Sequence, residues 1–238
     1  MTMSISAPFN RRQSVGEIAA ALPGATAVFR RFGLDFCCKG DVPLEDSARL
    51  RGVPLGDVEQ ALASLDTHAT AEAPGETAPL IAHILARYHE VHRRELPELV
   101  ALARRVEAVH ARHPDVPRGL ADLLERLRQE LESHMRKEEL ILFPAMAQAE
   151  ATYGGGLEAP ISCMRHEHDD HGANLRELEA LTRDFTLPAG ACRTWHALYA
   201  GGAKLVDDVM EHIHLENNLL FPRFAPSPRI QVARRRFG

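Results

Sequence analysis

Residues 133–144, SHMRKEELILFP, decide the fold of this chain, because residues 211–222 repeat their pattern as EHIHLENNLLFP. In both stretches a histidine precedes a glutamate by four residues, as His134 and Glu138 and as His212 and Glu216. Residues four apart on an α-helix point in the same direction. Each stretch therefore predicts a helix that carries a histidine and a glutamate on one face.

A further histidine precedes each pair at nearly the same distance. His89 lies 45 residues before His134, and His168 lies 44 residues before His212. Residues 80–224 thus form two copies of one helical hairpin, in which the first helix supplies a histidine and the second a histidine and a glutamate. Apolar residues recur at helical spacing on the same faces, so we expect all six side chains to point into one apolar interior.

Turn-forming sequences divide this region into four long helical patterns. We expect helices over about 80–110, 118–150, 160–183 and 190–224, separated by HPDVPRG, TYGGG and FTLPAG. Short connections join antiparallel neighbours, so the sequence predicts an up-down four-helix bundle over residues 80–225. Three prolines should each kink or end a helix locally, namely Pro97, Pro144 and Pro222.

The residues before the bundle predict a small helical domain over 13–65. Ser14-Val-Gly-Glu17 matches the capping box that begins a helix, and Gly33 is placed to end a second helix, over 23–32. Two more short helices are expected over 44–51 and 55–65. The fold class is therefore all-α, with a small N-terminal helical domain followed by the bundle.

Three segments are expected to lack regular structure. They are a disordered N-terminus at 1–12, a linker rich in Thr, Ala, Pro and Gly at 66–79, and a tail at 226–238. The linker is expected to let the two domains move separately.

Composition indicates a globular protein. The chain of 238 residues is 45% apolar and 26% charged with a net charge of −5, so we expect no nucleic-acid partner. It contains no apolar run of 18 residues and no apolar leader core, so neither a membrane span nor a secretory signal is expected. Two of its four cysteines are adjacent, which makes a poor disulfide framework and favours the reducing cytoplasm.

Two carboxylates in an apolar interior predict bound metal. Burying an unpaired carboxylate costs several kcal/mol, whereas a cation neutralises it and accepts imidazole lone pairs. Two glutamates from opposite helices can each bridge two metals, and two histidines can complete each metal. This ligand set suits iron or manganese with open positions better than four-coordinate zinc. A single HxxxE arises often by chance, but the duplication with matched upstream histidines favours a dinuclear site.

Five residues near the ligands are candidates for orienting the imidazoles or carrying protons: Glu130, Glu167, Asp208, His92 and His171. For each acid, a solvated carboxylate on a helix face is an equally good interpretation. The two histidines each follow a ligand by three residues, and we favour a supporting role over additional ligation. His166 and His214 lie two residues from a ligand and should point to the surface.

Cys37 and Cys38 are neighbours in the loop DFCCKG, which follows the helix ending at Gly33. Adjacent cysteines rarely bond to each other because the ring is strained, while Lys39 and local amides can lower a thiol pKa. A redox-active or metal-transferring thiol pair and two small buried residues are equally good interpretations. The single cysteines Cys163 and Cys192 are interpreted as packing residues within helices.

Over nearly its whole length the chain resembles the iron–sulfur cluster repair di-iron proteins, also called repair of iron centres proteins. FRRFGLDFCCKG resembles their N-terminal domain, and RYHEVHRRELPEL, ELESHMRKEELILFP, HEHDDHG and LENNLLFPR resemble their hemerythrin-like domain. Lys39 departs from the glycine that the family often has there. The resemblance implies a non-haem di-iron centre with terminal ligands His89, His134, His168 and His212 and bridging carboxylates Glu138 and Glu216.

The resemblance also implies that Cys37 and Cys38 are the paired cysteines of the family, and that the chain acts in the cytoplasm on clusters damaged by nitric oxide or oxidants. We expect two oxo- and carboxylate-bridged iron ions, iron donation to damaged or apo iron–sulfur proteins, and a monomer or homodimer. Two alternatives stay open: a nitric oxide reductase, and a non-catalytic protein that senses or stores nitric oxide or dioxygen. Whether the chain is an enzyme is therefore left open.

Overall fold

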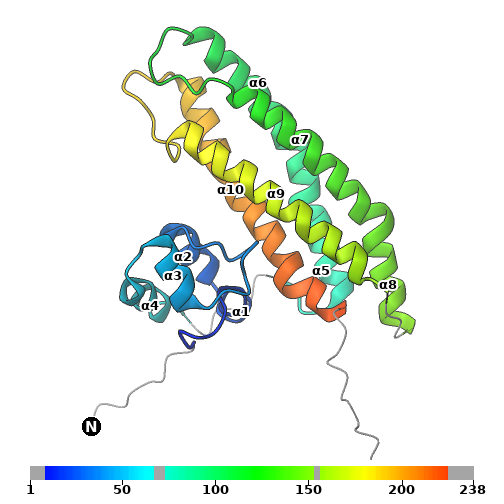
Figure 1. Cartoon of the computed structure of the whole chain (residues 1–238). Coiled ribbons are helices and arrows are strands. Elements are labelled where there is room, and N and C mark those ends of the chain that lie inside the picture. Colours follow the sequence, from blue (N-terminus) through cyan, green and yellow to red (C-terminus); the bar gives the residue numbers. More distant parts are fainter. Residues whose placement is uncertain (1–8, 67–72, 153–155, 225–238) are drawn as a thin grey trace, which may run out of the picture.

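The computed structural model describes residues 9–66, 73–152 and 156–224, which form a small helical domain beside a long helical bundle (Figure 1). Within these ranges the regular elements are all helical. No helix in the described part of the chain is long and apolar enough to span a bilayer. The prediction of an all-α chain is therefore confirmed.

Four short helices make up the N-terminal domain: α1 (Val15–Ala21), α2 (Ala25–Phe32), α3 (Leu44–Arg51) and α4 (Leu55–Ala63). The predicted capping box begins α1, because the Ser14 hydroxyl accepts from the Glu17 N–H at 3.2 Å and the Glu17 carboxylate accepts from the Ser14 N–H at 3.1 Å. α2 ends at Gly33, whose φ of 65° lies in the left-handed region that glycine adopts without strain.

Four long helical segments build the bundle. The first comprises α5 (Thr77–Ile84), η1 (Leu85–His89) and α6 (Glu90–Val109), and the second comprises α7 (Leu120–Lys137), η2 (Glu138–Leu142) and α8 (Phe143–Thr152). The third is α9 (Glu158–Thr182), and the fourth comprises α10 (Arg193–His214), η3 (Leu215–Leu220) and η4 (Phe221–Phe224). The turns η1, η2 and η3 are π-helical, and consecutive segments run antiparallel (Figure 1).

Two of the three prolines do not end a helix. α6 continues past Pro97 to Val109, and α8 contains Pro144 and continues to Thr152, whereas Pro222 lies in the short 3-10 turn η4. A π-helical turn stands directly before α8 and directly before η4, in each of which the proline is the second residue. The wider turn gives a proline ring more room against the preceding carbonyl groups.

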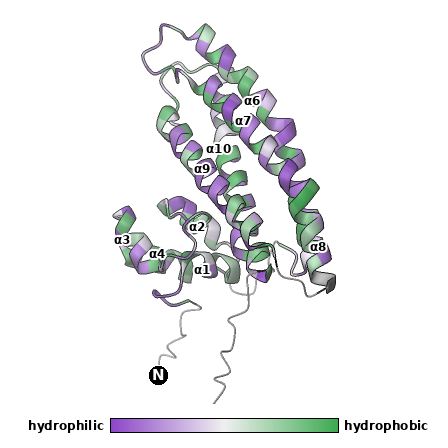
Figure 2. Cartoon of the chain, turned by 45° about the vertical axis from the view of Figure 1, so that its right-hand side comes forward, coloured by the Kyte–Doolittle hydropathy of each residue, from purple (hydrophilic) through white to green (hydrophobic). Residues whose placement is uncertain are grey.

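The N-terminal domain packs against the bundle and shares an apolar core with it. The larger cluster of buried residues joins Phe29, Phe36 and Cys37 of the domain to Leu175 and Val209 of the bundle. Hydrophobic and hydrophilic residues alternate along the helices of both parts (Figure 2). The linker was expected to let the two domains move separately, whereas in the structure this shared apolar surface packs them together.

The contact between the two parts is centred on η3. A Cβ atom on Gly16 would lie 2.6 Å from Asn218 Oδ1, so glycine allows α1 to approach the turn closely. Asn218 Nδ2 donates to the Phe36 carbonyl at 2.9 Å, and Asn217 Nδ2 donates to the Cys37 carbonyl at 2.9 Å. The turn that holds the domain therefore also contains one of the predicted ligands.

Candidate metal centre

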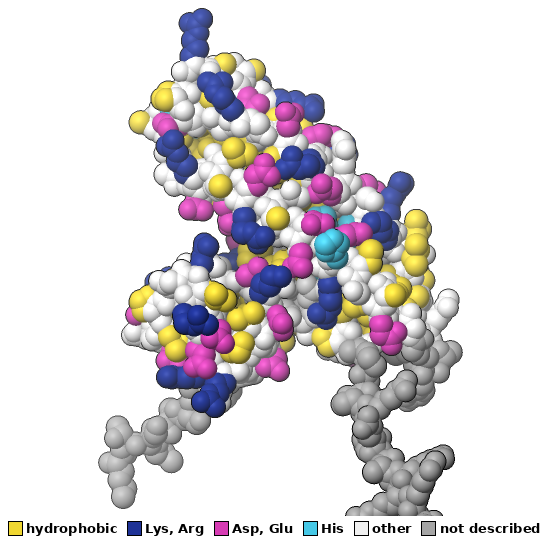
Figure 3. Space-filling model, viewed as in Figure 1, with side chains coloured by type: hydrophobic (Ala, Val, Ile, Leu, Met, Phe, Trp, Pro, Cys, Tyr) yellow, Lys and Arg dark blue, Asp and Glu magenta, His cyan; other side chains and the backbone are white. Residues whose placement is uncertain are grey.

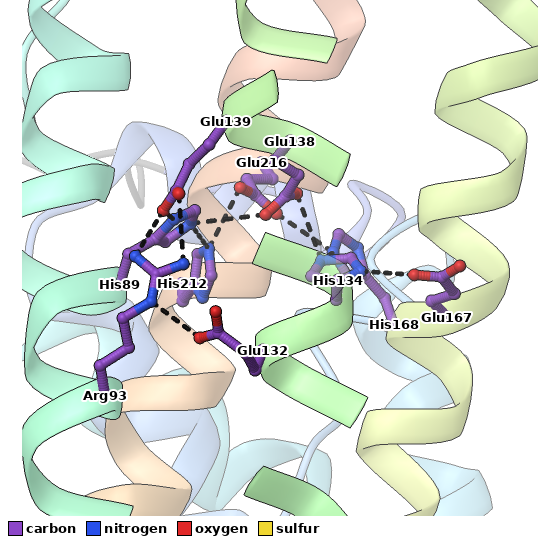
Figure 4. A network of polar contacts seen from close by, with 10 residues as sticks. All are labelled: His89, Arg93, Glu132, His134, Glu138, Glu139, Glu167, His168, His212 and Glu216. Carbon is purple, nitrogen blue, oxygen red and sulfur yellow. Dashed lines mark hydrogen bonds and ion pairs between the residues drawn. The ribbon is translucent and has the colours of Figure 1, made fainter. Parts of the chain in front are cut away.

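The six predicted ligands converge inside the bundle (Figure 4). None is more than 1% exposed, and they form two groups of four whose ligating atoms lie within 4.8 Å of one another. The groups are His89, Glu138, His212 and Glu216, and His134, Glu138, His168 and Glu216. Both glutamates thus belong to both groups.

Each glutamate directs one oxygen to each group. Glu138 Oε2 lies 3.4 Å from His89 Nε2, and Glu138 Oε1 lies 3.2 Å from His134 Nε2. Glu216 Oε1 lies 3.1 Å from His212 Nε2, and Glu216 Oε2 lies 3.1 Å from His168 Nε2. This division of oxygens is what two bridging carboxylates require.

The four imidazoles face each other in two pairs, one on either side of the glutamates (Figure 4). The Nε2 atoms of His89 and His212 are 3.2 Å apart, and those of His134 and His168 are 3.0 Å apart. Such short separations require a proton or a cation between the nitrogens, because two facing lone pairs repel each other.

Oxygen acceptors orient three of these rings through Nδ1. The contacts are His89 to Glu139 Oε1 at 2.8 Å, His134 to Glu167 Oε2 at 2.8 Å and His168 to Asn217 Oδ1 at 3.0 Å. A ring that donates outward from Nδ1 presents the lone pair of Nε2 inward, which is the tautomer that binds metal.

Several buried polar atoms at the centre have no hydrogen bond of acceptable geometry among the described residues. They are both carboxylate oxygens of Glu138, Oε2 of Glu216 and Nδ1 of His212. An unpaired buried polar group costs about 1–3 kcal/mol, so native proteins rarely leave such groups together. One cation in each group of four would give the carboxylate oxygens their missing partners. The residues present therefore fit a pair of metal ions.

In the metal-free site, protons supply part of the positive charge. Burial alone would lower the pKa of His134, but the carboxylates of Glu138, Glu167 and Glu216 outweigh burial and raise this pKa to about 10. The pKa of His89 is also raised, against the effect of burial, by its neighbouring glutamates. Burial favours protonated carboxylates, yet the surrounding histidines hold the pKa values of Glu138 and Glu216 below their ordinary range.

Three of the six candidate ligands lie within π-helical turns. His89 ends η1, Glu138 begins η2, and Glu216 lies within η3. A π-helical turn inserts one extra residue into a helix, and it occurs often at functional sites because it redirects side chains. The three π-helical turns therefore direct ligand side chains toward the interior. The α-helical turns on either side of each keep their regular apolar face.

Known proteins match both parts of the chain. Residues 80–224 match the hemerythrin HHE cation binding domain, and residues 11–66 match a domain of unknown function, DUF542. The iron–sulfur cluster repair protein YtfE of Dickeya chrysanthemi is 48% identical over 216 residues, covering 90% of this chain and 96% of the relative. The YtfE proteins of Edwardsiella ictaluri and Pectobacterium atrosepticum are 49% and 46% identical, with the same shares covered.

The chain belongs to the YtfE family of iron–sulfur cluster repair proteins. The resemblance stated from the sequence motifs is therefore confirmed.

Two of the acids expected to support the YtfE-family site have other partners. Glu130 accepts from Asn174 Nδ2 at 2.6 Å, and Asp208 forms ion pairs with Arg87 and Lys204, both at 2.7 Å. Each acid lies one turn before a ligand on the same helix, at the edge of the core, where polar side chains from a neighbouring helix reach both acids and Lys204 of the same helix also reaches Asp208. Glu167 does contact an imidazole, but that of His134 on another helix and not that of its neighbour His168.

His92 and His171 pack against the ligands and are not among the converging ligand atoms. The ring centroid of His92 lies 5.5 Å from that of His212, and the ring centroid of His171 lies 5.0 Å from that of His134. Burial is the main cause that lowers the pKa of His92 to about 3 and that of His171 to about 2. Both rings are thus neutral neighbours of the ligands.

His214 is 2% exposed and does not lie on the surface as expected. Its ring packs edge-on against Phe36 with centroids 5.5 Å apart, and its Nδ1 accepts from Asn218 Nδ2 at 2.8 Å. The N-terminal domain covers this face of α10, which a bundle alone would expose. His166 is exposed, as expected.

Sequence reasoning missed Glu139 and Asn217, which orient His89 and His168. Each follows a ligand glutamate directly, so both occupy the same position in the duplicated pattern. In a regular α-helix that position points about 100° away from the glutamate. A comparison of the two copies for polar residues beside the ligands would have found both.

The paired cysteines lie behind His168. Cys38 Sγ donates to the His168 carbonyl at 3.4 Å, and Asn217 links the Cys37 carbonyl to the His168 ring. The hydrogen bond with Cys38 and burial raise the pKa of the Cys37 thiol. Cys163 is exposed and does not pack in the core, whereas Cys192, the N-cap residue of α10, is half-buried and packs against the larger cluster as expected.

Proposed function

We propose that this chain holds two iron ions through the six converging residues and repairs iron–sulfur clusters damaged by nitrosative or oxidative stress by donating iron. The observation that carries the proposal is the pair of four-residue groups that share both glutamates. The relatives named iron–sulfur cluster repair proteins support the choice of substrate. When bound, a di-iron pair would supply redox-active Lewis acids with positions open to small ligands such as nitric oxide.

The residues of the site suit an ion that is held and then released. Four neutral imidazoles and two carboxylates bring only two negative charges to two divalent cations, so the site holds the second ion less tightly than a carboxylate-rich site would. Glu139, Glu167 and Asn217 keep the imidazoles in their binding orientation. We therefore favour iron donation over permanent retention, with Cys37 and Cys38 acting in delivery.

The proposed setting is the cytoplasm, with damaged or apo iron–sulfur proteins as recipients and nitric oxide as the damaging agent. The four cysteines of the chain are all free, which supports a reducing compartment. Monomer and homodimer are both compatible with a site built from one chain.

Metal analysis tests the ligand assignment. We expect about two irons per chain in the unmodified protein and a marked loss in Glu138→Ala and Glu216→Ala, because each carboxylate serves both groups. Glu130→Ala is the matched control, since this acid lies on the same helix as Glu138 but binds Asn174. Normal iron content in both ligand variants would refute the assignment.

Iron transfer tests the function. Iron-loaded protein should restore the activity of a dehydratase whose cluster has been damaged by nitric oxide, while metal-free protein and Glu138→Ala should not. Nitrous oxide measured in the same reaction decides between donation and nitric oxide reduction. Catalytic nitrous oxide formation without loss of protein-bound iron would overturn the donor mechanism.

A further inference from the structure

The loop between α2 and α3 brings a second group of metal-binding atoms together. Asp35, Cys37 and Cys38 each offer one atom, and these atoms lie within 4.8 Å of one another. We propose that this group, the loop site, binds one divalent cation with affinity for thiolate, such as ferrous iron or zinc. This ion is additional to the pair proposed for the histidine site.

The distances within the loop site suit a shared cation. Cys37 Sγ lies 3.6 Å from Cys38 Sγ and 3.5 Å from Asp35 Oδ1. Two thiolates at about 2.3 Å from one tetrahedral ion lie about 3.8 Å apart, and a thiolate and a carboxylate oxygen at about 2.1 Å lie about 3.6 Å apart. A disulfide would need sulfurs at about 2.05 Å. The two sulfurs and the carboxylate oxygen of Asp35, all within 4.8 Å of one another, therefore have the spacing of ligands to one ion.

Backbone hydrogen bonds hold this arrangement. The N–H groups of Cys38 and Lys39 donate to Asp35 Oδ1 at 2.9 and 3.4 Å, and the Cys37 carbonyl accepts from Asn217. Arg176 lies 3.8 Å from Asp35 Oδ2, the other carboxylate oxygen. Oδ1 therefore stays beside the Cys37 sulfur without any help from a bound ion.

The loop site is accessible from a cleft between the N-terminal domain and the bundle. The cleft has a volume of about 500 Å³, and Asp35, Cys37 and Cys38 all contribute to its lining. The space-filling view shows the hollow between the two parts, with charged side chains around it (Figure 3). Cys37 is buried, whereas Asp35 and Cys38 are half-buried. Three protein ligands leave one tetrahedral position open, and this position can accept a ligand from the cleft.

Binding of the ion conserves charge and protons and changes no oxidation state. The divalent ion enters, both thiols release their protons, and the ion forms bonds to two thiolates and one carboxylate. The group carries one negative charge before binding, from Asp35, and one afterwards. Its surroundings, which include Lys39 and Arg176, therefore meet the same net charge in both states.

The position of the loop site gives it a place in iron transfer. Cys38 Sγ contacts the backbone carbonyl of His168, whose imidazole lies in the histidine site. An ion that leaves the histidine site toward the cleft would therefore meet the thiols next. This role in transfer rests on the proposed function, whereas binding of a third ion does not.

Cobalt(II) is the probe, because its bonds to thiolate give intense charge-transfer absorption. Co²⁺ is titrated into full-length, iron-loaded protein that is kept reduced with a phosphine. We expect one Co²⁺ per chain with this absorption in the unmodified protein. Cys37→Ser and Cys38→Ser should each lose the absorption, and Asp35→Asn should weaken binding tenfold or more. Cys163→Ser, which removes an exposed thiol, is the control and should match the unmodified protein.

Iron content of the same samples reports whether the fold and the histidine site are intact, and it should be unchanged in all four variants. Absence of thiolate absorption in the unmodified protein would overturn the loop site, as would absorption that survives in both cysteine variants. Cobalt binding by a chain that fails to repair clusters would support the loop site and reject only the proposed function.

Discussion

Asn217 serves two partners with one amide. Its Oδ1 accepts from His168 Nδ1 at 3.0 Å, and its Nδ2 donates to the Cys37 carbonyl at 2.9 Å. The residue follows Glu216 in η3. A single side chain thus connects a candidate ligand of the histidine site to the thiol loop, and its loss would leave buried groups without partners on both sides.

We expect Asn217→Leu to weaken iron binding about 10- to 100-fold, because residues that orient metal ligands typically have effects of this size. Asn217→Asp keeps an acceptor for His168 but loses the donor to Cys37, so it should bind iron more tightly than the leucine variant. Competition with a chelator measures both affinities, and Glu130→Gln serves as the control. Equal affinity in all these proteins would show that Asn217 does not orient His168.

At the scale of elements, α1 fits against η3 only because residue 16 is glycine. A Cβ atom there would lie 2.6 Å from Asn218 Oδ1 and 2.8 Å from the Gly40 carbonyl. Backbone cannot move aside as a flexible side chain can, so the contact leaves no room for alanine. Gly56, in α4, has no atom within 4 Å of the corresponding position.

These two glycines make a matched pair for a stability measurement. Gly16→Ala should lower the free energy of unfolding by roughly 1–3 kcal/mol through overpacking. Gly56→Ala should raise it by up to about 1 kcal/mol, because alanine favours helix and meets no neighbour. Denaturant unfolding of both variants gives the two values. If Gly16→Ala proved as stable as Gly56→Ala, the close approach of α1 to η3 would be wrong.

Helix positions could be predicted from local pattern, since the capping box at Ser14, the glycine stop at Gly33 and the HxxxE spacing are all short-range signals. The π-helical turns could not be predicted, because a single inserted residue leaves the helical spacing of apolar residues unchanged within the segment before it and within the segment after it. The first bundle helix begins at Thr77, within the expected linker, because Pro79 falls in the first turn, where a missing N–H is tolerated.

The sequence predicted the ligands of the candidate site, but it predicted fewer of the residues that surround them. The repeated pattern predicted the six converging residues, because the matching faces of the two hairpins must both point into the interior of the bundle. The docking of the N-terminal domain could not be predicted from local pattern. It joins apolar residues far apart in the chain, such as Phe36 and Val209, and it also uses Gly16, Asn217 and Asn218. For that reason the burial of His214 appears only in three dimensions.

At the scale of the whole molecule, the bundle is built around a charge balance. Two glutamates with 0% exposure face His89 and His134, whose pKa values are raised. A proton on His134, whose pKa is raised to about 10, would offset part of the carboxylate charge in the absence of metal. Metal ions would displace that proton and neutralise the carboxylates more strongly, so folding and metal binding are coupled.

Chelation should therefore lower the melting temperature, and it should do so more at alkaline pH. The pKa of His134 rises from 6.5 to about 10 in the folded metal-free protein. Its protonation therefore contributes stability that is complete below the unfolded value of 6.5 and is lost as the pH rises through about 10. Iron-loaded protein should lack this loss, because the metal holds the ring in its neutral form.

Thermal melts of loaded and chelated protein at about pH 6.5 and about pH 9.5 measure the difference. A double variant, Glu138→Gln with Glu216→Gln, is the control. It removes both buried charges, so its melting should not respond to the chelator. Through His134 it should respond less to this change of pH than the unmodified protein does, because of the three carboxylates only Glu167 still raises the pKa of that ring. An unchanged melt of the unmodified protein after verified removal of all metal would contradict a buried site. The difference in melting temperature between loaded and chelated protein should widen as the pH rises, because the metal-free core loses its protons. A difference that shrinks would contradict the charge balance.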